Sequence, residues 1–414
     1  MNKAIAALNR EFPALRTRFC GRRLVYLDSA CTVLKMRCAA DAQRESLLRL
    51  GGCGGRRSFY SLSSEMEEAF EAARRTVAWL MGAGSPDEVI FTGGVTDAAN
   101  LLANSFPFTK DRNEVVLSPL EHNAVFLPFE RLAAAGRVKL KVLPLKGLTP
   151  DLDALPRLLG RRTALVCLNH ASNIFGGRQE LRRAAALARA AGAYLFSDDA
   201  QFSPTHGSGA AAEGADACAF SGHKLGAPYC TGALYVRREL LAKLRPWRVG
   251  GGTVEGVTLA GGYKAKYIGG NRGFEAGVQN YAGAAGLAAA IGRLERAGFG
   301  NIRAHVSGLV LDAHERLSSV KGVRVLGGKA ALAEGSLLSI VPEKRGFSSR
   351  DFALFLDSSV KGLSIAVRSG RHCADLACLS SGVKETLRLS YFTYNTADDT
   401  ELFARVLERY LRMI

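Results

Sequence analysis

A lysine placed directly after an apolar strand pattern is the most informative feature of this sequence. Residues 215–220 predict a strand that leads into Ser221-Gly222-His223-Lys224, and a second apolar run follows at 231–236. A lysine amine in such a turn can form a Schiff base with a carbonyl cofactor such as pyridoxal phosphate (PLP). The alternative is that Lys224 is one of 55 basic residues in an ordinary surface loop.

Four further strand patterns end in polar residues that suit the same cofactor. The short apolar runs at 89–92, 115–118, 165–168 and 194–196 alternate with helix patterns such as 97–104 and 180–191. This alternation predicts a mainly parallel sheet. Ligands of parallel sheets bind beyond the carboxyl ends of the strands. One ligand there would contact all of the loops that follow these strands.

Each loop offers a group with a definite role toward PLP. A carboxylate beside the pyridine nitrogen keeps that nitrogen protonated, and a charge pair near 4 Å is worth about 4 kcal/mol at an effective dielectric near 20. We predict Asp198 for this role, with Asp199 as its rival, and His122 to stack on the ring. We expect other residues to bind the ring oxygen or the phosphate, in part through the N–H groups of a helix N-terminus. These residues are Asn173, Gln201, Ser221, His223, Thr96, Val95 and Gly94.

Taken together and in order, these motifs resemble those of SUF-type cysteine desulfurases, which are PLP-dependent enzymes of the class V aminotransferase fold. The resemblance extends nearly end to end, through Tyr26-Leu27-Asp28-Ser29-Ala30, Glu121-His122, Asn169-His170-Ala171-Ser172-Asn173, Asp198-Asp199-Ala200-Gln201, Ser221-Gly222-His223-Lys224, Phe274-Glu275-Ala276-Gly277 and Arg368-Ser369-Gly370-Arg371-His372-Cys373-Ala374. It implies that Lys224 binds PLP covalently, that Cys373 accepts the sulfur and that Arg388 holds the substrate carboxylate. It also implies a substrate site that includes Ala30, Asn173 and Arg368.

Cys373 distinguishes the reactions that this fold performs. Transamination needs only the lysine and the cofactor, whereas removing sulfur from cysteine needs a nucleophile that keeps the sulfur as a persulfide. Arg368, Arg371 and His372 bring positive or potentially positive groups to this thiol, which favours its thiolate. A buried inert thiol is the alternative for an arbitrary cysteine. Cys378 follows five residues later and matches no role in the family pattern.

Four positions depart from the family pattern. Val95 and Val278 stand where hydroxyl residues usually bind the phosphate, so we expect backbone groups to hold more of it. Tyr60 stands roughly where a histidine is common, and Arg371 replaces the first histidine of a common His-His-Cys. Three alternatives stay open. They are a selenocysteine lyase, because selenium leaves more easily than sulfur, another class V PLP lyase or aminotransferase, and a non-catalytic scaffold with the same fold, which the changes at Val95 and Val278 leave possible.

The expected fold is α/β, of the PLP-dependent transferase fold type I. We predict a large domain, residues 19–292, with a mainly parallel seven-stranded sheet and a helix at 281–294. A smaller α+β domain would combine residues 1–18 and 293–414 and carry Cys373 and Arg388, with the strands 323–326, 336–341 and 386–390 and the helices 349–358 and 398–412. The glycine-rich stretch 250–273 predicts no compact element. By resemblance it borders a homodimer interface and the partner subunit's active site.

Composition fits a cytoplasmic enzyme. A chain of 414 residues with 48% hydrophobic content can bury a large core and divide into two domains. Its nine cysteines, odd in number and without close paired spacing, argue for reduced thiols rather than disulfides or a zinc site. The N-terminus is too short in its apolar part for a signal peptide, and no run approaches the roughly 18 apolar residues of a membrane span.

The formal net charge of +17 would by itself favour nucleic-acid binding. The arginines, however, come in scattered pairs without a basic run or a nucleic-acid motif, so we predict neither a nucleic-acid nor a membrane partner. The expected reaction converts L-cysteine to L-alanine and carries the sulfur as a Cys373 persulfide. The expected partners are a second copy of the chain and a sulfur-acceptor protein, in iron–sulfur cluster or thio-cofactor assembly.

Overall fold

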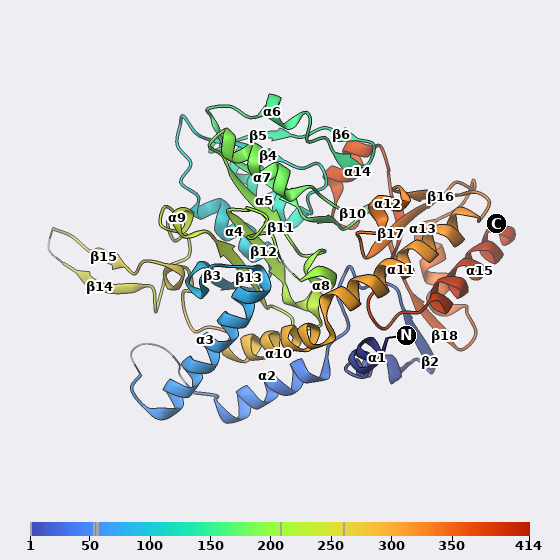
Figure 1. Ribbon diagram of the computed structural model, residues 1–414, viewed down its shortest axis with the longest axis horizontal. Coiled ribbons are helices and arrows are strands. Elements are labelled where there is room, and N and C mark those ends of the chain that lie inside the picture. The colour runs from blue at the N-terminus through green and yellow to red at the C-terminus, as the bar shows by residue number, and fades with distance from the viewer. Residues whose placement is uncertain (1, 53, 55–57, 208, 260) are drawn as a thin grey trace.

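A seven-stranded sheet forms the centre of the computed structural model, which describes residues 2–52, 54, 58–207, 209–259 and 261–414 (Figure 1). In spatial order its strands are β3 (Val89–Thr92), β13 (Gly232–Val236), β12 (Ala217–Ser221), β11 (Tyr194–Asp198), β8 (Thr163–Asn169), β4 (Glu114–Leu117) and β5 (Lys139–Val142). Only β13 runs antiparallel to its neighbours in this sheet. The predicted mainly parallel seven-stranded sheet is confirmed.

Both faces of this sheet are buried. Successive side chains of a strand point to opposite faces, so each strand contributes to two cores. In β4, Val115 and Leu117 pack into one core and Val116 packs into the other. The helices α4 (Val95–Ser105) and α5 (Asn123–Ala134) cover the first face. The helices α7 (Leu181–Ala190) and α10 (Tyr281–Ala297) cover the second. The carboxyl ends of six strands therefore share one edge of a layer that is closed on both sides.

The C-terminal part of the chain builds a second, antiparallel sheet beside the first. Its strand order is β16 (Val323–Leu326), β17 (Leu337–Pro342), β20 (Thr386–Ser390) and β19 (Arg368–Gly370). Apolar side chains of α11 (Phe299–Ser318), α13 (Ser349–Ser358) and α15 (Ala397–Met413) pack in the same core as β17 and β20. The strand β2 (Arg22–Tyr26) pairs with β18 (Leu363–Ala366), which joins the two ends of the chain. The division of domains at residues 292 and 293 stays a prediction.

The remaining elements are short or peripheral. They are the helices α1 (Lys3–Asn9), α2 (Arg37–Arg49), α3 (Ser61–Met81), α6 (Leu155–Leu158), α8 (Ser203–His206), α9 (Arg238–Leu241), α12 (Lys329–Leu332) and α14 (Asp375–Ser381), the 3-10 turns η1 (Pro13–Arg16), η2 (Pro86–Glu88), η3 (Gly222–Leu225) and η4 (Asn271–Phe274), and the strands β1 (Arg18–Phe19), β6 (Leu145–Lys146), β7 (Thr149–Pro150), β9 (Ala171–Ser172), β10 (Gly176–Arg178), β14 (Val254–Thr258) and β15 (Lys264–Tyr267).

The glycine-rich stretch forms a hairpin, contrary to our expectation of no compact element. β14 and β15 pair antiparallel and project from the body of the molecule (Figure 1). Large apolar side chains on it face solvent, and Leu259 and Tyr263 are 72% and 89% exposed. Backbone pairing within the hairpin needs no buried face, which is why a search for apolar patterns missed it.

A buried ion pair ties α3 to the edge of the central sheet. The Arg74 guanidinium is fully buried and donates from Nη1 and Nη2 to the two carboxylate oxygens of Glu275, at 2.6 and 2.8 Å. Glu275 also accepts a hydrogen bond from the Phe91 N–H at 2.8 Å, and Arg74 donates to the Val89 carbonyl at 2.9 Å. Glu275 of the Phe274-Glu275-Ala276-Gly277 motif thus binds α3 through Arg74 and the edge strand β3 through the Phe91 N–H.

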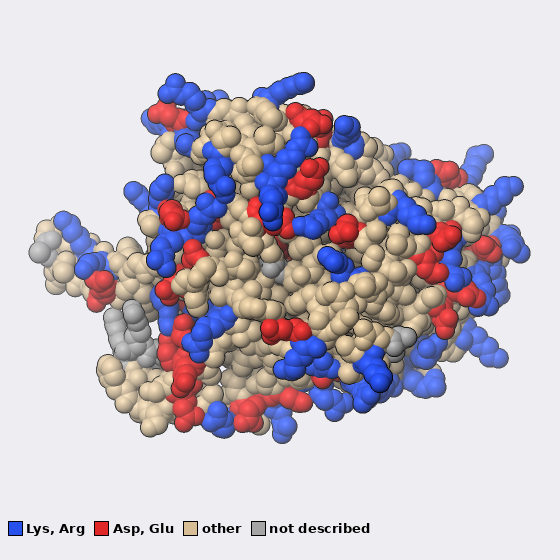
Figure 2. Space-filling view, viewed as in Figure 1, with Lys and Arg blue, Asp and Glu red and all other residues tan. Residues whose placement is uncertain are grey.

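Charged side chains of both signs intermingle on the surface. Figure 2 shows Lys and Arg side chains spread between acidic ones on the face displayed. Some of them form ion pairs, as where Arg272 bridges Glu67 and Glu71 of α3. Among the described residues, no helix combines the length and apolar character that crossing a bilayer requires.

Candidate active site

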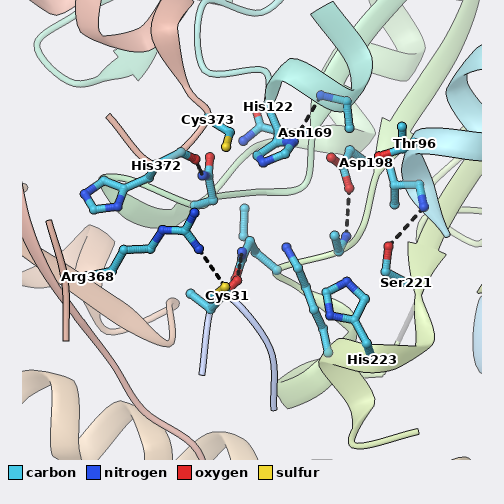
Figure 3. A pocket seen from close by; sticks show the side chains of 18 of the residues that line it. Cys31, Thr96, His122, Asn169, Asp198, Ser221, His223, Arg368, His372 and Cys373 are labelled. Atoms are coloured by element: carbon cyan, nitrogen blue, oxygen red, sulfur yellow. Dashed lines mark hydrogen bonds between the residues drawn. The ribbon is translucent and has the colours of Figure 1, made fainter. Parts of the chain in front are cut away.

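A cavity of about 230 Å³ lies where the carboxyl ends of the central strands meet the C-terminal sheet (Figure 3). Thirteen of the fourteen predicted site residues line it, namely Ala30, Val95, Thr96, His122, Asn173, Asp198, Gln201, Ser221, His223, Lys224, Arg368, Cys373 and Arg388. Gly94 is not among the lining residues. The cavity also has three polar lining residues that we did not assign to the site: Cys31, Asn169 and His372. Residues far apart in the sequence therefore converge on one cavity.

Lys224, half-buried in the turn η3 after β12, and Asp198, buried at the end of the adjacent strand β11, supply a cation and an anion to the cavity. Burial lowers the pKa of Lys224 to about 8, although the negative charge of Asp198 opposes this shift. Burial raises the pKa of Asp198 to about 6, opposed by Lys224 and by the Ala200 N–H, which donates to Asp198 Oδ1 at 2.9 Å. The rival Asp199 does not line the cavity, and its Oδ1 accepts from the Ser197 hydroxyl at 2.5 Å instead. The geometry thus favours Asp198 for the ring nitrogen.

His122 presents a neutral imidazole to the cavity. It precedes α5, and its Nδ1 accepts a hydrogen bond from the Ala124 N–H at 3.0 Å. The proton of the neutral ring therefore sits on Nε2. Burial lowers the pKa of His122 to about 3, and the charges of Lys224, Arg388 and Arg368 lower it further. An uncharged ring in this place suits stacking on a flat cofactor.

The N-terminus of α4 forms the other end of the cavity. Gly94 has φ +131, and a Cβ there would lie 2.9 Å from the Ser221 hydroxyl oxygen, so glycine permits this close approach. That oxygen accepts a hydrogen bond from the Val95 N–H at 3.0 Å. The Val95 amide, which we expected to be available to a phosphate, is therefore already bonded. The hydrogen of the Ser221 hydroxyl and the side chain of Thr96 remain available.

His223 completes this end of the cavity. Its Nδ1 lies 3.2 Å from the Thr32 hydroxyl, and the ring stacks loosely with Tyr229. Burial lowers the pKa of His223 to about 4, assisted by Lys224 and Lys35. A neutral His223 offers one N–H rather than a second positive charge.

Arg388 and Asn173 carry buried polar atoms that lack hydrogen-bond partners within the described chain. Arg388 is 2% exposed and donates from Nη1 to the Asn173 carbonyl at 2.8 Å and from Nη2 to Asp28 at 2.9 Å, but its Nε has no partner. The Asn173 amide donates to the His372 carbonyl at 2.8 Å, while its Oδ1 has no partner. Buried polar groups are normally satisfied, so both atoms indicate that a ligand completes the site.

Of the eight cysteines that the structure describes, only Cys31 and Cys373 line the cavity. Cys373 is exposed and lies between β19 and α14 with φ +54. Cys378 is buried in α14, and burial raises the pKa of its thiol. His372 was expected to add positive charge beside Cys373, but burial lowers its pKa to about 3, so at neutral pH the charge comes from arginines alone.

The other departures from the family pattern lie outside the cavity. Tyr60 precedes α3 and is 49% exposed, and Val278 is 86% exposed. Arg371 is exposed and contacts Asp375 at 3.3 Å. Of the four departures, only Val95 lines this chain's own site.

A lysine and a buried aspartate that line one cavity at the carboxyl edge of this sheet are the groups that a PLP-dependent enzyme of fold type I requires. The chain belongs to the class V aminotransferase family, whose model, described as "Aminotransferase class-V", matches residues 25–403. The predicted family, fold and cofactor are thereby confirmed.

Relatives and solved structures agree with this assignment. The chain is 35% identical to a probable cysteine desulfurase of Vibrio cholerae, over 95% of each chain. It is 33% identical to a cysteine desulfurase of Serratia proteamaculans, over the full length of both. Its structure matches that of the apo cysteine desulfurase from Thermococcus onnurineus with a TM-score of 0.89 and 30% identity, over 99% of this chain and 98% of the other.

Proposed function

We propose that this chain is a cysteine desulfurase that converts L-cysteine to L-alanine and keeps the sulfur on Cys373. One observation carries the proposal: the exposed Cys373 thiol lines the same cavity as Lys224, Asp198 and Arg388. A lysine and a carboxylate would suffice for transamination. An accessible thiol in the same cavity adds the nucleophile that sulfur removal requires.

The residues of the cavity fit PLP. Lys224 lines the cavity with an amine whose lowered pKa leaves part of it uncharged and nucleophilic near neutral pH. Asp198 offers a carboxylate for the pyridine nitrogen, and the neutral His122 offers a flat face. Asn173 Oδ1 has no partner within the described chain and remains to be satisfied by a ligand. When bound, PLP supplies an electron sink for the negative charge that develops on the substrate's α-carbon.

Lys224 and Arg388 then have separate tasks. The Lys224 amine holds the cofactor and carries the proton at the substrate's α-carbon. The Arg388 guanidinium holds the substrate carboxylate with its unused N–H groups, among them the Nε–H that has no partner in the described chain. Asp28 keeps this guanidinium in place through the contact at 2.9 Å.

The sulfur step falls to Cys373. Its thiolate attacks the substrate sulfur, a sulfur–sulfur bond forms on Cys373, and the carbon–sulfur bond of the substrate breaks. The electron pair of the broken bond stays with the carbon skeleton, which takes up a proton and leaves as alanine. Cys378 is the poorer candidate, because its buried thiol has a raised pKa.

The test is an assay of alanine release from L-cysteine by the wild type and by Cys373→Ser. The wild type should release alanine and show one extra sulfur by mass spectrometry on the peptide that carries Cys373. The serine variant should still bind PLP and L-cysteine but release no alanine. Full activity in that variant, or the extra sulfur on Cys378, would refute the proposal.

We further propose the setting in which this enzyme acts. This setting is the cytoplasm, where thiols such as that of Cys373 are kept reduced. The exposed apolar residues of the β14–β15 hairpin, together with the exposed Val278, support a homodimer in which Val278 faces the partner subunit's site. A sulfur-acceptor protein for iron–sulfur cluster or thio-cofactor assembly would remove the persulfide. Light scattering tests the dimer, and stimulation of the rate by an added acceptor tests the transfer.

A further inference from the structure

A second thiol shares the cavity with Cys373, and the reaction described above gives it no part. Cys31 follows Ala30 in the turn after β2 and is half-buried. Its sulfur accepts a hydrogen bond from Arg368 Nη1 (Figure 3). Within the described residues this is the only hydrogen bond of the Arg368 side chain. The position of that guanidinium in the cavity therefore depends on Cys31.

Arg368 and Arg388 form a pair at the substrate end of the cavity. They lie opposite each other on the antiparallel strands β19 and β20, and both line the cavity. Two guanidiniums so placed repel each other, and each has a hydrogen-bond partner that holds it in position. Asp28 is the partner of Arg388, at 2.9 Å, and Cys31 is the partner of Arg368. A single turn, residues 28–31, thus holds both guanidiniums.

We propose that Cys31 is a positioning residue for substrate recognition. Its sulfur holds the Arg368 guanidinium against the cavity wall, so that the other N–H groups of Arg368 face the substrate carboxylate beside Arg388. A guanidinium carries five donors in one plane, so a single fixed hydrogen bond sets the direction of the rest. Without that bond, the long side chain must lose its rotamer freedom each time substrate binds. The inference rests on the proposed function, because it gives both arginines to the substrate carboxylate.

The kinetic test compares Cys31→Ala with Cys31→Ser. The alanine variant removes the acceptor, so KM for L-cysteine should rise about tenfold while kcat stays within twofold, the pattern of lost binding common to ground and transition states. The serine hydroxyl can accept the same hydrogen bond, so its KM should stay within threefold of the wild-type value. Cys38→Ala is the matched control, because Cys38 is also half-buried but contacts the Ala289 carbonyl outside the cavity.

A double-mutant cycle tests the coupling of Cys31 to Arg368. If Cys31 acts through Arg368, the Cys31→Ala change should have no further effect on KM in an Arg368→Ala protein. Additive losses in the double variant would overturn the proposal. Thermal unfolding and the visible spectrum of bound PLP establish that each variant is folded and loaded.

A binding measurement separates this role from a general structural one. L-alanine and ethylamine, which is alanine without its carboxylate, are titrated into the PLP-loaded proteins by calorimetry. Cys31→Ala should weaken L-alanine binding about tenfold and leave ethylamine binding unchanged. Equal weakening of both ligands, or no change in either, would overturn the proposal. Failure of the proposed function would appear differently, as a wild-type protein that binds L-alanine but releases none from L-cysteine.

Discussion

Replacing Arg388 with lysine should weaken substrate binding sharply without disturbing the cofactor. The guanidinium uses Nη1 for the Asn173 carbonyl and Nη2 for Asp28, and its Nε remains without a partner in the described chain. A single ammonium cannot keep these contacts and still present a fork to a carboxylate. Losing one hydrogen bond to a charged group costs about 1.5–3 kcal/mol. At about 1.4 kcal/mol per factor of ten, KM should rise about 10- to 100-fold.

Initial rates of alanine release over a range of L-cysteine concentrations measure this change, and the visible absorbance of bound PLP should stay at its wild-type position. Arg324→Lys is the control, because Arg324 lies in the same sheet but is exposed and paired with Glu343 at 3.0 Å. Its KM should match the wild type. An unchanged KM for Arg388→Lys would show that the substrate carboxylate is held elsewhere, and the reasoning from the unpartnered Nε would fall.

Three other substitutions test the site and its support. Val95→Thr adds a hydroxyl beside Ser221 where a phosphate would lie, so equilibrium dialysis should show PLP held severalfold more tightly; equal retention contradicts this. In the PLP-free protein, Lys224→Met should raise the melting temperature at pH 7. Folding lowers the pKa of this lysine from 10.5 to about 8, so keeping it charged below pH 8 lowers the free energy of unfolding by about 3 kcal/mol. This gain should shrink from pH 8 to 10.5, and a lower melting point at pH 7 would refute it. Glu275→Gln leaves the buried Arg74 with Glu71, at 3.0 Å, as its remaining carboxylate partner. The free energy of unfolding should therefore fall by about 3 kcal/mol in urea titrations, the lower end of the cost of breaking a buried pair, and a loss below about 1 kcal/mol would count against that pair.

The sequence by itself determined the sheet, the family and most of the cavity lining. The predicted strands at 89–92, 323–326 and 386–390 and the helix at 349–358 match β3, β16, β20 and α13 residue for residue. These segments are short apolar or amphipathic runs bounded by turn residues, so local pattern and burial agree. The lysine turn and the polar residues after each strand were also readable, because the carboxyl ends of parallel strands must share an edge.

Only the tertiary structure decided how these groups are charged and paired. It placed Asp198 rather than Asp199 in the cavity, and burial, which no local pattern reports, made His372 neutral. The contact between Cys31 and Arg368 joins residues 337 positions apart. A sequence pattern specifies which residues follow a strand, whereas a partner across the cavity depends on how two sheets pack against each other, and that packing exists only in the folded chain.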